Sequence, residues 1–416
     1  MKKKSAPKSV STDVPLLVPG YKQFGGRQVE AAALRNVLAH LGIVAPHTGE
    51  PFTDALLFGL GGGIGLSYFV YASGDFTSLF LATRITTSPT GFVETMCTRI
   101  GAKATIQTAS TPAAAEKKLK QALAEGRPPI LWVDPGGLPY YGTPAAYHTL
   151  VVYGFDESLD EVHIADRSDR PITLTHAELT RARQSGDVRK FPALLVDTPR
   201  PIRLPALKTA VTQGLRDCCG QMQKGFGPAN FRSNFGLKAL EKWAGLLINP
   251  KDPRGWPKFF PRGPKLYQAL VSVFDQVENR GSGGSAFREL YADFLVEAEE
   301  ILSKPKFDGV AKQFRESARL WGALSAALLP DEVPLFKETK QLTVKKRLLF
   351  EKEGAAARDE AKTLSARLEG IRVQVEKTFP MSEAEVQDLL TDVRQHVLAI
   401  HAVEKQAVKT LESLIG

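Results

Sequence analysis

The sequence predicts an α+β domain with a mainly antiparallel sheet, followed by an all-α helical domain. Helices and then a run of short apolar strands fill the chain up to about residue 197, and almost only helical patterns come after a proline-rich segment. Helices followed by a run of strands are typical of α+β domains. With 416 residues, the chain is long enough for two or three domains, each with its own core.

The composition is that of an ordinary globular protein with a moderately basic charge. Hydrophobic residues make up 43% of the chain, and the formal net charge is +9. Nucleic-acid binding needs clustered charge, and Lys2, Lys3 and Lys4 form the only such run that we find, so no nucleic-acid partner is expected. Because no apolar run could span a membrane and three cysteines make no disulfide framework, we expect a cytoplasmic protein without membrane contact.

Four parts of the chain are predicted. We expect a flexible tail over residues 1–20, the α+β domain over 21–198, the helical domain over 206–335 and a long helical hairpin extension over 336–416. Prolines crowd the stretch 198–205, and proline-rich segments favour extended linkers. The boundary between the two folded domains is therefore predicted within that stretch.

The first predicted helix runs from Val29 to Leu41, directly after a glycine pair. Its apolar residues recur every three or four positions, which is typical of a helix with a buried face. These residues are Ala31, Leu34, Val37, Leu38 and Leu41. Gly25 and Gly26 allow a sharp turn before the helix. The glycines of 59–65 fit no dinucleotide-binding register, so we expect either a tight turn or a loop that faces a ligand.

Four strands form the predicted sheet, with helices around them. The strands are expected over 129–133, 148–154, 160–166 and 191–196, and the helices over 93–100, 114–125 and 175–183. His148 begins the second strand and Asp166 ends the third. If these two strands are neighbours, the two side chains lie side by side at one end of the sheet.

A histidine beside a carboxylate has two interpretations at this point. In the functional one, His148 accepts a proton and Asp166 fixes its tautomer, as the base and its orienting group do in a Cys-His-Asp arrangement. In the structural one, the two residues form a buried pair without a catalytic role. The spacing fits both. The histidines are otherwise scattered along the chain, so no metal site and no cofactor are expected.

Helical patterns account for the chain after the linker. Helices are expected over 207–222, 236–247, 266–277, 286–302, 310–329, 345–379 and 382–414. The last two are predicted to pair as an antiparallel hairpin, and Ser382 forms a capping box with Glu385 at the start of the final helix. Such a hairpin buries too little apolar surface to fold alone. We therefore expect 345–414 to dock on the helical domain, on a second copy of the chain or on a partner protein.

Two further groups of side chains have both a structural and a functional interpretation. Glu289, Asp293 and Glu297 mark a helix that either packs by its aromatic face or presents a negative wall to a cationic substrate. Cys218 and Cys219 offer thiols on the first helix after the linker, and we expect neither to serve as a nucleophile.

Several motifs occur in the order found in a known family. GGRQVEAAALRNVLAHLG, FGLGGGIG, YHTLVVYGFD and HIADRS resemble the amino-terminal domain of the butirosin biosynthesis H family, a family of papain-like acyltransferases. GLKALEKWAGLL, GWPKFF and ENRGSGGSAFRELYADFLVEAEEIL resemble the helical domain of unknown function that commonly follows it. Together, the motifs span about residues 20–330.

The resemblance implies a papain-like, cysteine-peptidase-like fold. It also implies a reaction that moves an aminoacyl group from an acyl carrier protein to an aminoglycoside amine. The family's nucleophile position carries a His-Cys pair followed by Glu, at the start of a helix whose dipole favours a thiolate. This chain has Gln28, Val29 and Glu30 at that place, so it lacks the thiol.

Other site positions match the family. His148 and Asp166 stand at the positions of the catalytic pair, and Glu30 keeps its place after the nucleophile position. Gln23 lies six residues before Val29, a spacing that resembles the oxyanion-hole glutamine of papain-like enzymes. The resemblance therefore implies a cleft that holds Gln23 and Glu30, with His148 and Asp166 as catalytic remnants.

Two functions follow as hypotheses. The first is a non-catalytic relative of papain-like acyltransferases, a pseudoenzyme that serves as a binding or scaffold subunit in a bacterial biosynthetic or peptide-processing system. The alternative is an acyltransferase or amide hydrolase that uses His148 and Asp166 without a cysteine. The partners that these hypotheses imply are an acyl carrier protein or a small amine, and a second copy or a partner protein bound through 345–414.

Overall fold

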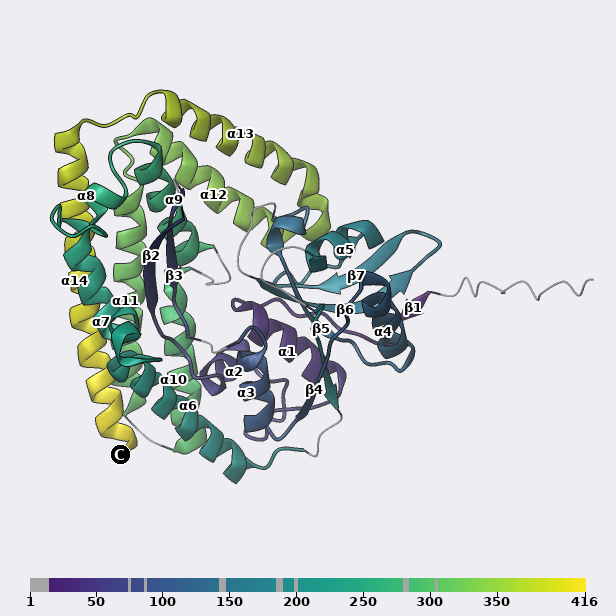
Figure 1. The fold of residues 1–416 in the computed structure, drawn as a ribbon. Coiled ribbons are helices and arrows are strands. Elements are labelled where there is room, and N and C mark those ends of the chain that lie inside the picture. The colour runs from purple at the N-terminus through teal and green to yellow at the C-terminus, as the bar shows by residue number, and fades with distance from the viewer. Residues whose placement is uncertain are drawn as a thin grey trace, which may run out of the picture.

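The structure is a computed structural model that describes residues 15–73, 76–85, 88–141, 147–184, 190–197, 201–279, 284–303 and 306–416. It confirms the predicted fold class, an α+β region with an antiparallel sheet followed by a helical region. The two regions lie side by side, and helices α12 (Pro334–Glu353) and α13 (Arg358–Lys377) reach from the helical region across to the sheet (Figure 1). No helix within the described ranges is long and apolar enough to cross a membrane.

The larger sheet is antiparallel throughout. Its strands are β1 (Leu16–Leu17), β4 (Lys103–Gln107), β5 (Ile130–Val133), β6 (His148–Asp156), β7 (Glu161–Ala165), β8 (Ile172–Leu174) and β9 (Ala193–Asp197). The order across the sheet is β4-β9-β5-β6-β7-β8, and β1 pairs with the far half of β6. Strands β6 and β7 are direct neighbours, with Val151 opposite Ala165, as the placement of His148 and Asp166 required.

Helices cover both faces of this sheet. They are α1 (Val29–His40), α2 (Asp54–Leu60), α3 (Gly91–Arg99), α4 (Pro112–Ala124) and α5 (His176–Gln184). Ile130 and Trp132 of β5 belong to the core that holds α1, α2 and α3, whereas Leu131 and Val133 belong to the core that holds α4 and α5. Successive side chains of a strand point to opposite faces, so β5 is buried on both sides.

A second sheet was not predicted. It consists of β2 (Ser67–Ser73) and β3 (Phe76–Ala82), paired in register from Ser67 with Ala82 onwards. The hairpin packs against helices α7 (Gly236–Leu247) and α9 (Pro264–Glu278) of the helical region rather than against the larger sheet. Tyr68 anchors it, because its hydroxyl accepts a hydrogen bond from Trp256 Nε1 at 2.8 Å.

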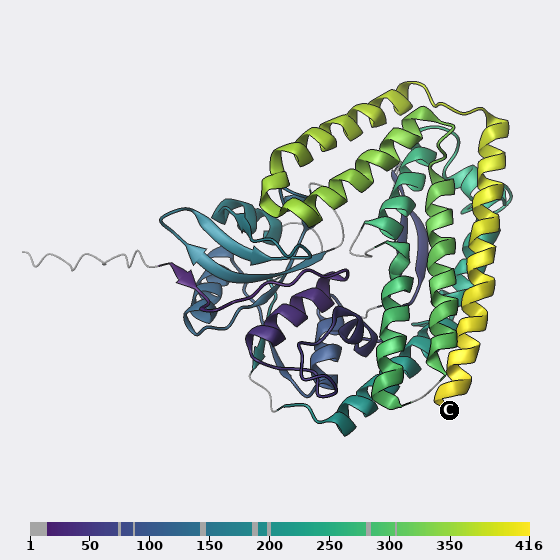
Figure 2. The same cartoon turned by 180° about the vertical axis from the view of Figure 1, so that it is seen from behind.

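The helical region holds the rest of the chain. Its helices are α6 (Leu204–Lys224), α7 (Gly236–Leu247), α8 (Trp256–Phe259), α9 (Pro264–Glu278), α10 (Arg288–Leu302), α11 (Phe307–Leu328), α12 (Pro334–Glu353), α13 (Arg358–Lys377) and α14 (Glu383–Ile415). Short 3₁₀ turns are found at Pro135–Gly137, Ala229–Asn234, Ser285–Phe287 and Gly354–Ala357. In both views α14 runs along α11, and it also packs on α6 and α7 (Figures 1 and 2).

The predicted pairing of the last helices is wrong. Instead of one helix over 345–379, the chain forms α12 and α13, separated at Gly354, whose φ of 56° lies in the left-handed region that favours glycine. These two helices pair with each other, and α14 packs on α11, α7 and α6. The apolar stripe of α14, which suggested an interface with a second copy or a partner, is therefore covered by the chain itself.

The ends of the α+β region also differ from expectation. Residues 1–14 of the predicted tail lie outside the described residues. Leu16 and Leu17 form a strand that pairs with Phe155 and Gly154. In the predicted linker, residues 198–200 lie outside the described part of the chain, and α6 already begins at Leu204.

A buried ion pair holds three helices of the helical region together. Arg288 of α10 donates from Nε to Glu404 Oε1 at 2.7 Å and from Nη2 to Oε2 at 3.0 Å. Glu404 belongs to α14, and its Oε1 also accepts from Ser317 Oγ at 2.7 Å and from Trp321 Nε1 at 2.8 Å, both on α11. The side chains of Arg288 and Glu404 are fully buried.

The glycine-rich stretch 59–65 is a packing feature, which favours the tight turn over the loop that faces a ligand. A Cβ atom at Gly59 would lie 2.2 Å from the ring of Phe294, and one at Gly63 would lie 2.4 Å from the ring of Tyr291. Both rings belong to α10, so α2 and the turn after it touch the helical region at backbone distance.

Gly59→Ala is expected to destabilise the protein by about 1–3 kcal/mol, because the new methyl group overpacks the contact with Phe294. Gly245→Ala in α7 is the matched control, since a Cβ there meets no atom within 4 Å. That variant should raise stability by about 0.4–1 kcal/mol. Urea unfolding measures both, and equal midpoints for Gly59→Ala and the unchanged protein would contradict the packing role.

Candidate functional site

Val29 is the first residue of α1, at the place where the sequence resemblance puts a nucleophile. Gln28 caps the helix: its backbone is extended, and its side-chain Oε1 accepts from Ala31 N at 2.6 Å. Gly26 N donates to Arg167 O at 2.9 Å, which ties the turn before α1 to the chain just after β7. The start of α1 is thereby held next to the segment that carries Asp166.

Asp166 is a fully buried carboxylate with three donors around it. His148 Nε2 lies 2.7 Å from Oδ2, Tyr140 donates its hydroxyl to the same oxygen at 2.9 Å, and Arg167 N donates to Oδ1 at 2.6 Å. Burial raises the pKa of Asp166, but the charge and hydrogen bond of His148, together with Arg167, outweigh it and set the pKa below its usual value. Asp166 is therefore ionised at neutral pH and fixes the orientation of the imidazole.

The other ring nitrogen of His148, Nδ1, has no hydrogen-bond partner among the residues that the structure describes. The ring lies 4.7 Å from the ring of Tyr141, centre to centre. Tyr141 is in turn held by Arg167, which donates from Nη2 to the Tyr141 hydroxyl at 2.6 Å. His148 is thus fixed by a carboxylate and an aromatic ring, with one nitrogen left for a ligand.

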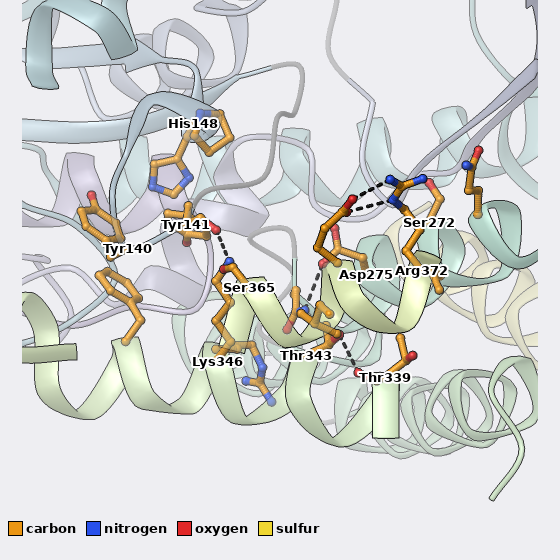
Figure 3. Close-up of a pocket in the computed structure, with 18 of the residues that line it drawn as sticks. Tyr140, Tyr141, His148, Ser272, Asp275, Thr339, Thr343, Lys346, Ser365 and Arg372 are labelled. Carbon is orange, nitrogen blue, oxygen red and sulfur yellow. Dashed lines mark hydrogen bonds and ion pairs between the residues drawn. The ribbon is translucent and has the colours of Figure 1, made fainter. Parts of the chain in front are cut away.

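Val29 and His148 line the same cavity, which has a volume of about 480 Å³ and lies between the two regions of the protein (Figure 3). At one end are Tyr140, Tyr141 and His148, and at the other end are Ser272, Asp275 and Arg372 (Figure 3). The long wall is made by α9, α12 and α13, through residues such as Tyr267, Val271, Thr339, Thr343, Lys346, Phe350, Ser365 and Leu368. A volume in this range suits a small organic ligand.

Helix α12 closes the His148 end of the cavity. Phe350 stacks on Tyr140 with ring centres 4.5 Å apart, and Lys346 Nζ donates to the backbone oxygen of Tyr141. Ser168 Oγ donates to Glu351 O at 3.1 Å, directly after the Asp166 segment. The site is therefore built from two segments nearly 200 residues apart in the sequence, β6–β7 and α12.

Gln23 and Glu30, which were expected in the cleft, and Gln28, at the nucleophile position, make contacts outside the cavity. Gln23 donates from Nε2 to the backbone oxygens of Ser168 and Arg170, both at 2.7 Å, so its amide nitrogen is committed to the chain, and the residue does not line the cavity. Gln28 and Glu30 also lie outside the cavity lining. The Gln28 side chain caps α1 and donates to Glu30, and Glu30 is a fully buried partner of Arg84.

The predicted negative wall is not part of the cavity. Asp293 pairs with Arg27 at 2.6 Å and with Arg315 at 3.1 Å, and Glu297 accepts from Thr53 Oγ1 at 2.6 Å. Glu289 pairs with Arg315. These carboxylates form ion pairs and hydrogen bonds with side chains of the chain itself, some of them near the contact between α2 and α10. None of the three lines the cavity.

No cysteine lines the cavity. Cys97, Cys218 and Cys219 are buried and do not line the cavity. Burial raises the pKa of Cys97 and of Cys219 to about 12, and it raises the pKa of Cys218 as well. Within the described ranges, no group of three or more His, Cys, Asp or Glu side chains could hold a metal ion.

Sequence reasoning missed several residues of the site. Tyr140 and Tyr141 stand a few residues before His148, and an aromatic pair close to a candidate base could have been noted as lining. Arg167 follows Asp166 directly. For Lys346 and Phe350 the sequence holds no such signal, because only the tertiary fold brings α12 to the sheet.

The fold and the site together define a class: an α+β domain in which a His–carboxylate pair faces the start of a buried helix, followed by a helical domain. Residues 28–167 match the family model described as butirosin biosynthesis protein H, N-terminal, and residues 177–359 match the domain of unknown function DUF4872. The chain thus carries these two family domains in this order. Membership of the first family indicates an acyltransferase-like or peptidase-like fold. No curated protein matches the chain.

The boundary between the two family domains is not a structural boundary. Strands on both sides of it belong to the larger sheet. The second match begins within α5 and includes β9, which pairs with both β4 and β5 of the first region's sheet. It ends just after α12, so the helix that closes the cavity belongs to the second family domain.

Proposed function

We propose that this chain is a non-catalytic relative of papain-like acyltransferases, which binds a ligand in the cavity between α1, β6 and α12 as a binding or scaffold subunit. One observation carries the proposal: Val29, a residue without a nucleophilic atom, lines the cavity beside His148 at the first position of α1. Covalent acyl transfer in this arrangement needs a nucleophile within hydrogen-bond reach of the base. The three cysteines lie buried elsewhere, which supports the same proposal.

Incubation with small-acid thioesters of N-acetylcysteamine is expected to leave the protein unacylated. The bond that would form is a thioester to a cysteine of the protein, with release of N-acetylcysteamine, and the buried cysteines have raised pKa values that disfavour the thiolate. Intact-mass spectrometry measures the adduct, and free-thiol release measures turnover. Stoichiometric acylation that disappears in Cys219→Ser would overturn the proposal.

A second candidate function is supported by the intact pair of His148 and Asp166. An acyltransferase or amide hydrolase without a cysteine would use His148 as general base on an amine or on water, with the ionised Asp166 holding its tautomer. The substrate would then carry its own activated acyl group, such as the thioester of an acyl carrier protein.

For this second candidate, His148→Ala is expected to lower any turnover of a thioester and an amine by about 10²- to 10⁴-fold, the usual contribution of a positioned base. Asp166→Asn should cause a large loss as well. Cys219→Ser is the control and should leave turnover unchanged. Turnover that survives His148→Ala at its original rate would remove the general-base mechanism.

A further inference from the structure

The wall of the cavity beside His148 is positively charged. It is lined by three cations, Arg167, Lys346 and Arg347. The two arginines share one carboxylate, because Arg167 Nη1 lies 3.3 Å and Arg347 Nη1 lies 3.4 Å from Glu351 Oε1. Asp166, which lies behind His148, is already bound to it. In the described part of the chain, no carboxylate lies within ion-pair distance of Lys346.

A hydrogen bond to the backbone oxygen of Tyr141 orients Lys346 towards the cavity. Its ammonium group donates one hydrogen to Tyr141 O, and the other two hydrogens have no acceptor among the described residues. The ring of Tyr141 contacts His148, so the ammonium lies one residue away from the candidate base (Figure 3). Burial lowers the pKa of Lys346, and the attraction of Asp275, which is more than ion-pair distance away, only partly offsets this effect. Lys346 is half-buried. A partly buried cation without a close partner is costly, and an incoming anion would reduce that cost.

We propose that the ligand of this cavity carries an oxyanion group, a carboxylate or a phosphate, which Lys346 binds next to His148. The remainder of the ligand lies along the wall of Tyr267, Val271 and Leu368, which combines aromatic and aliphatic surface. At the far end Arg372 is neutralised by Glu369, so the positive end of the cavity is the one at His148. This inference rests on the proposed function, in which the cavity holds a ligand.

A pair of fluorescent probes that differ in one anionic group tests the inference. 1-Anilinonaphthalene-8-sulfonate carries a sulfonate, and N-phenyl-1-naphthylamine is the same molecule without it. Lys346→Met keeps an unbranched side chain, one atom shorter, and removes its charge. We expect it to weaken sulfonate binding by about tenfold or more, the range of a charge-assisted hydrogen bond, and to change binding of the neutral probe by less than about twofold.

Lys345→Met is the matched control. Lys345 is exposed, pairs with Glu360 at 2.7 Å and does not line the cavity, so both probes should bind this variant as they bind the unchanged protein. Circular dichroism and thermal melting show whether Lys346→Met is folded. If it is not, Lys346→Gln replaces it, since an uncharged amide can still donate to Tyr141 O.

The outcomes separate the inference from the proposed function. If the neutral probe binds saturably and the sulfonate probe is unaffected by loss of Lys346, the cavity binds ligands but the oxyanion site is refuted. If neither probe binds saturably to the unchanged protein, the cavity is not a ligand site and the proposed function fails. Benzoate and phenyl phosphate, used as competitors, distinguish a carboxylate from a phosphate. Failure of both to displace the sulfonate probe would also overturn the inference.

Discussion

Val29→Cys is expected to create a thiol that reacts with iodoacetamide at pH 6 far faster than an ordinary exposed cysteine. Position 29 is the first residue of α1 and lines the same cavity as His148. Helix N-termini and neighbouring histidines lower cysteine pKa values from about 8.5 to the range of about 3.5–7.5. At pH 6 an ordinary thiol is less than about 1% thiolate, whereas a thiol with a pKa below about 6 is more than half thiolate.

The double variant Val29→Cys with His148→Ala is the control for this experiment. If His148 stabilises the thiolate as an ion pair, its removal should return the alkylation rate at pH 6 towards that of a simple thiol. Cys97, Cys218 and Cys219 are buried and should contribute only a slow background, which the unchanged protein measures. An ordinary alkylation rate at position 29, with an accessible thiol, would contradict the transfer of the nucleophile position from the family to this chain.

Loss of Glu404 is expected to cause the largest change in stability. Glu404→Ala leaves Arg288 buried without its carboxylate and also removes the acceptor of Ser317 and Trp321. Breaking a buried pair in this way typically costs about 3–5 kcal/mol. Urea unfolding of Glu404→Ala measures the loss. Glu338→Gln, which removes an exposed partner of Arg367, is the control and should shift the midpoint far less.

The same pair predicts a pH dependence. Burial raises the pKa of Glu404, but Arg288 and the hydrogen bonds from Trp321 and Ser317 outweigh it, so the folded-state pKa lies below the unfolded value. The stabilisation is therefore present above the unfolded pKa of about 4.3 and is lost as the pH falls through the folded pKa. Unfolding midpoints between pH 7 and pH 3 should fall less for Glu404→Ala than for the unchanged protein. Parallel curves would contradict this role.

Features set by local spacing were predictable from the sequence. The apolar spacing of α1 placed its start at Val29, and the boundaries of two strands placed His148 beside Asp166. The β2–β3 hairpin also had a local signal, since aromatic and β-branched residues such as Tyr68 and Phe69 precede the turn-type residues Gly74 and Asp75. The hairpin was therefore predictable from the sequence.

Features set by tertiary contact were not predictable. Gln23 has the spacing of an oxyanion-hole residue, yet its amide binds backbone oxygens about 145 residues further along the chain. Lys346 lies on a helix whose charged pattern is typical of a solvated surface, and only the fold brings it to His148. The division of α12 from α13 depends on the positive φ of Gly354. Because the sequence on both sides has a helical pattern, it predicts one continuous helix.

The core shared by the two regions has a consequence for synthesis on the ribosome. Ala407, Val408 and Leu411 of α14 belong to the same core as Leu34 of α1, although α14 is translated after every other element described here. Domains usually fold as units during translation, with the N-terminal one first. Here the shared core keeps an open side until α14 packs on α6, α7 and α11. We therefore expect the nascent helical region to depend on chaperones for most of translation, and to become protease-resistant only once α14 is in place.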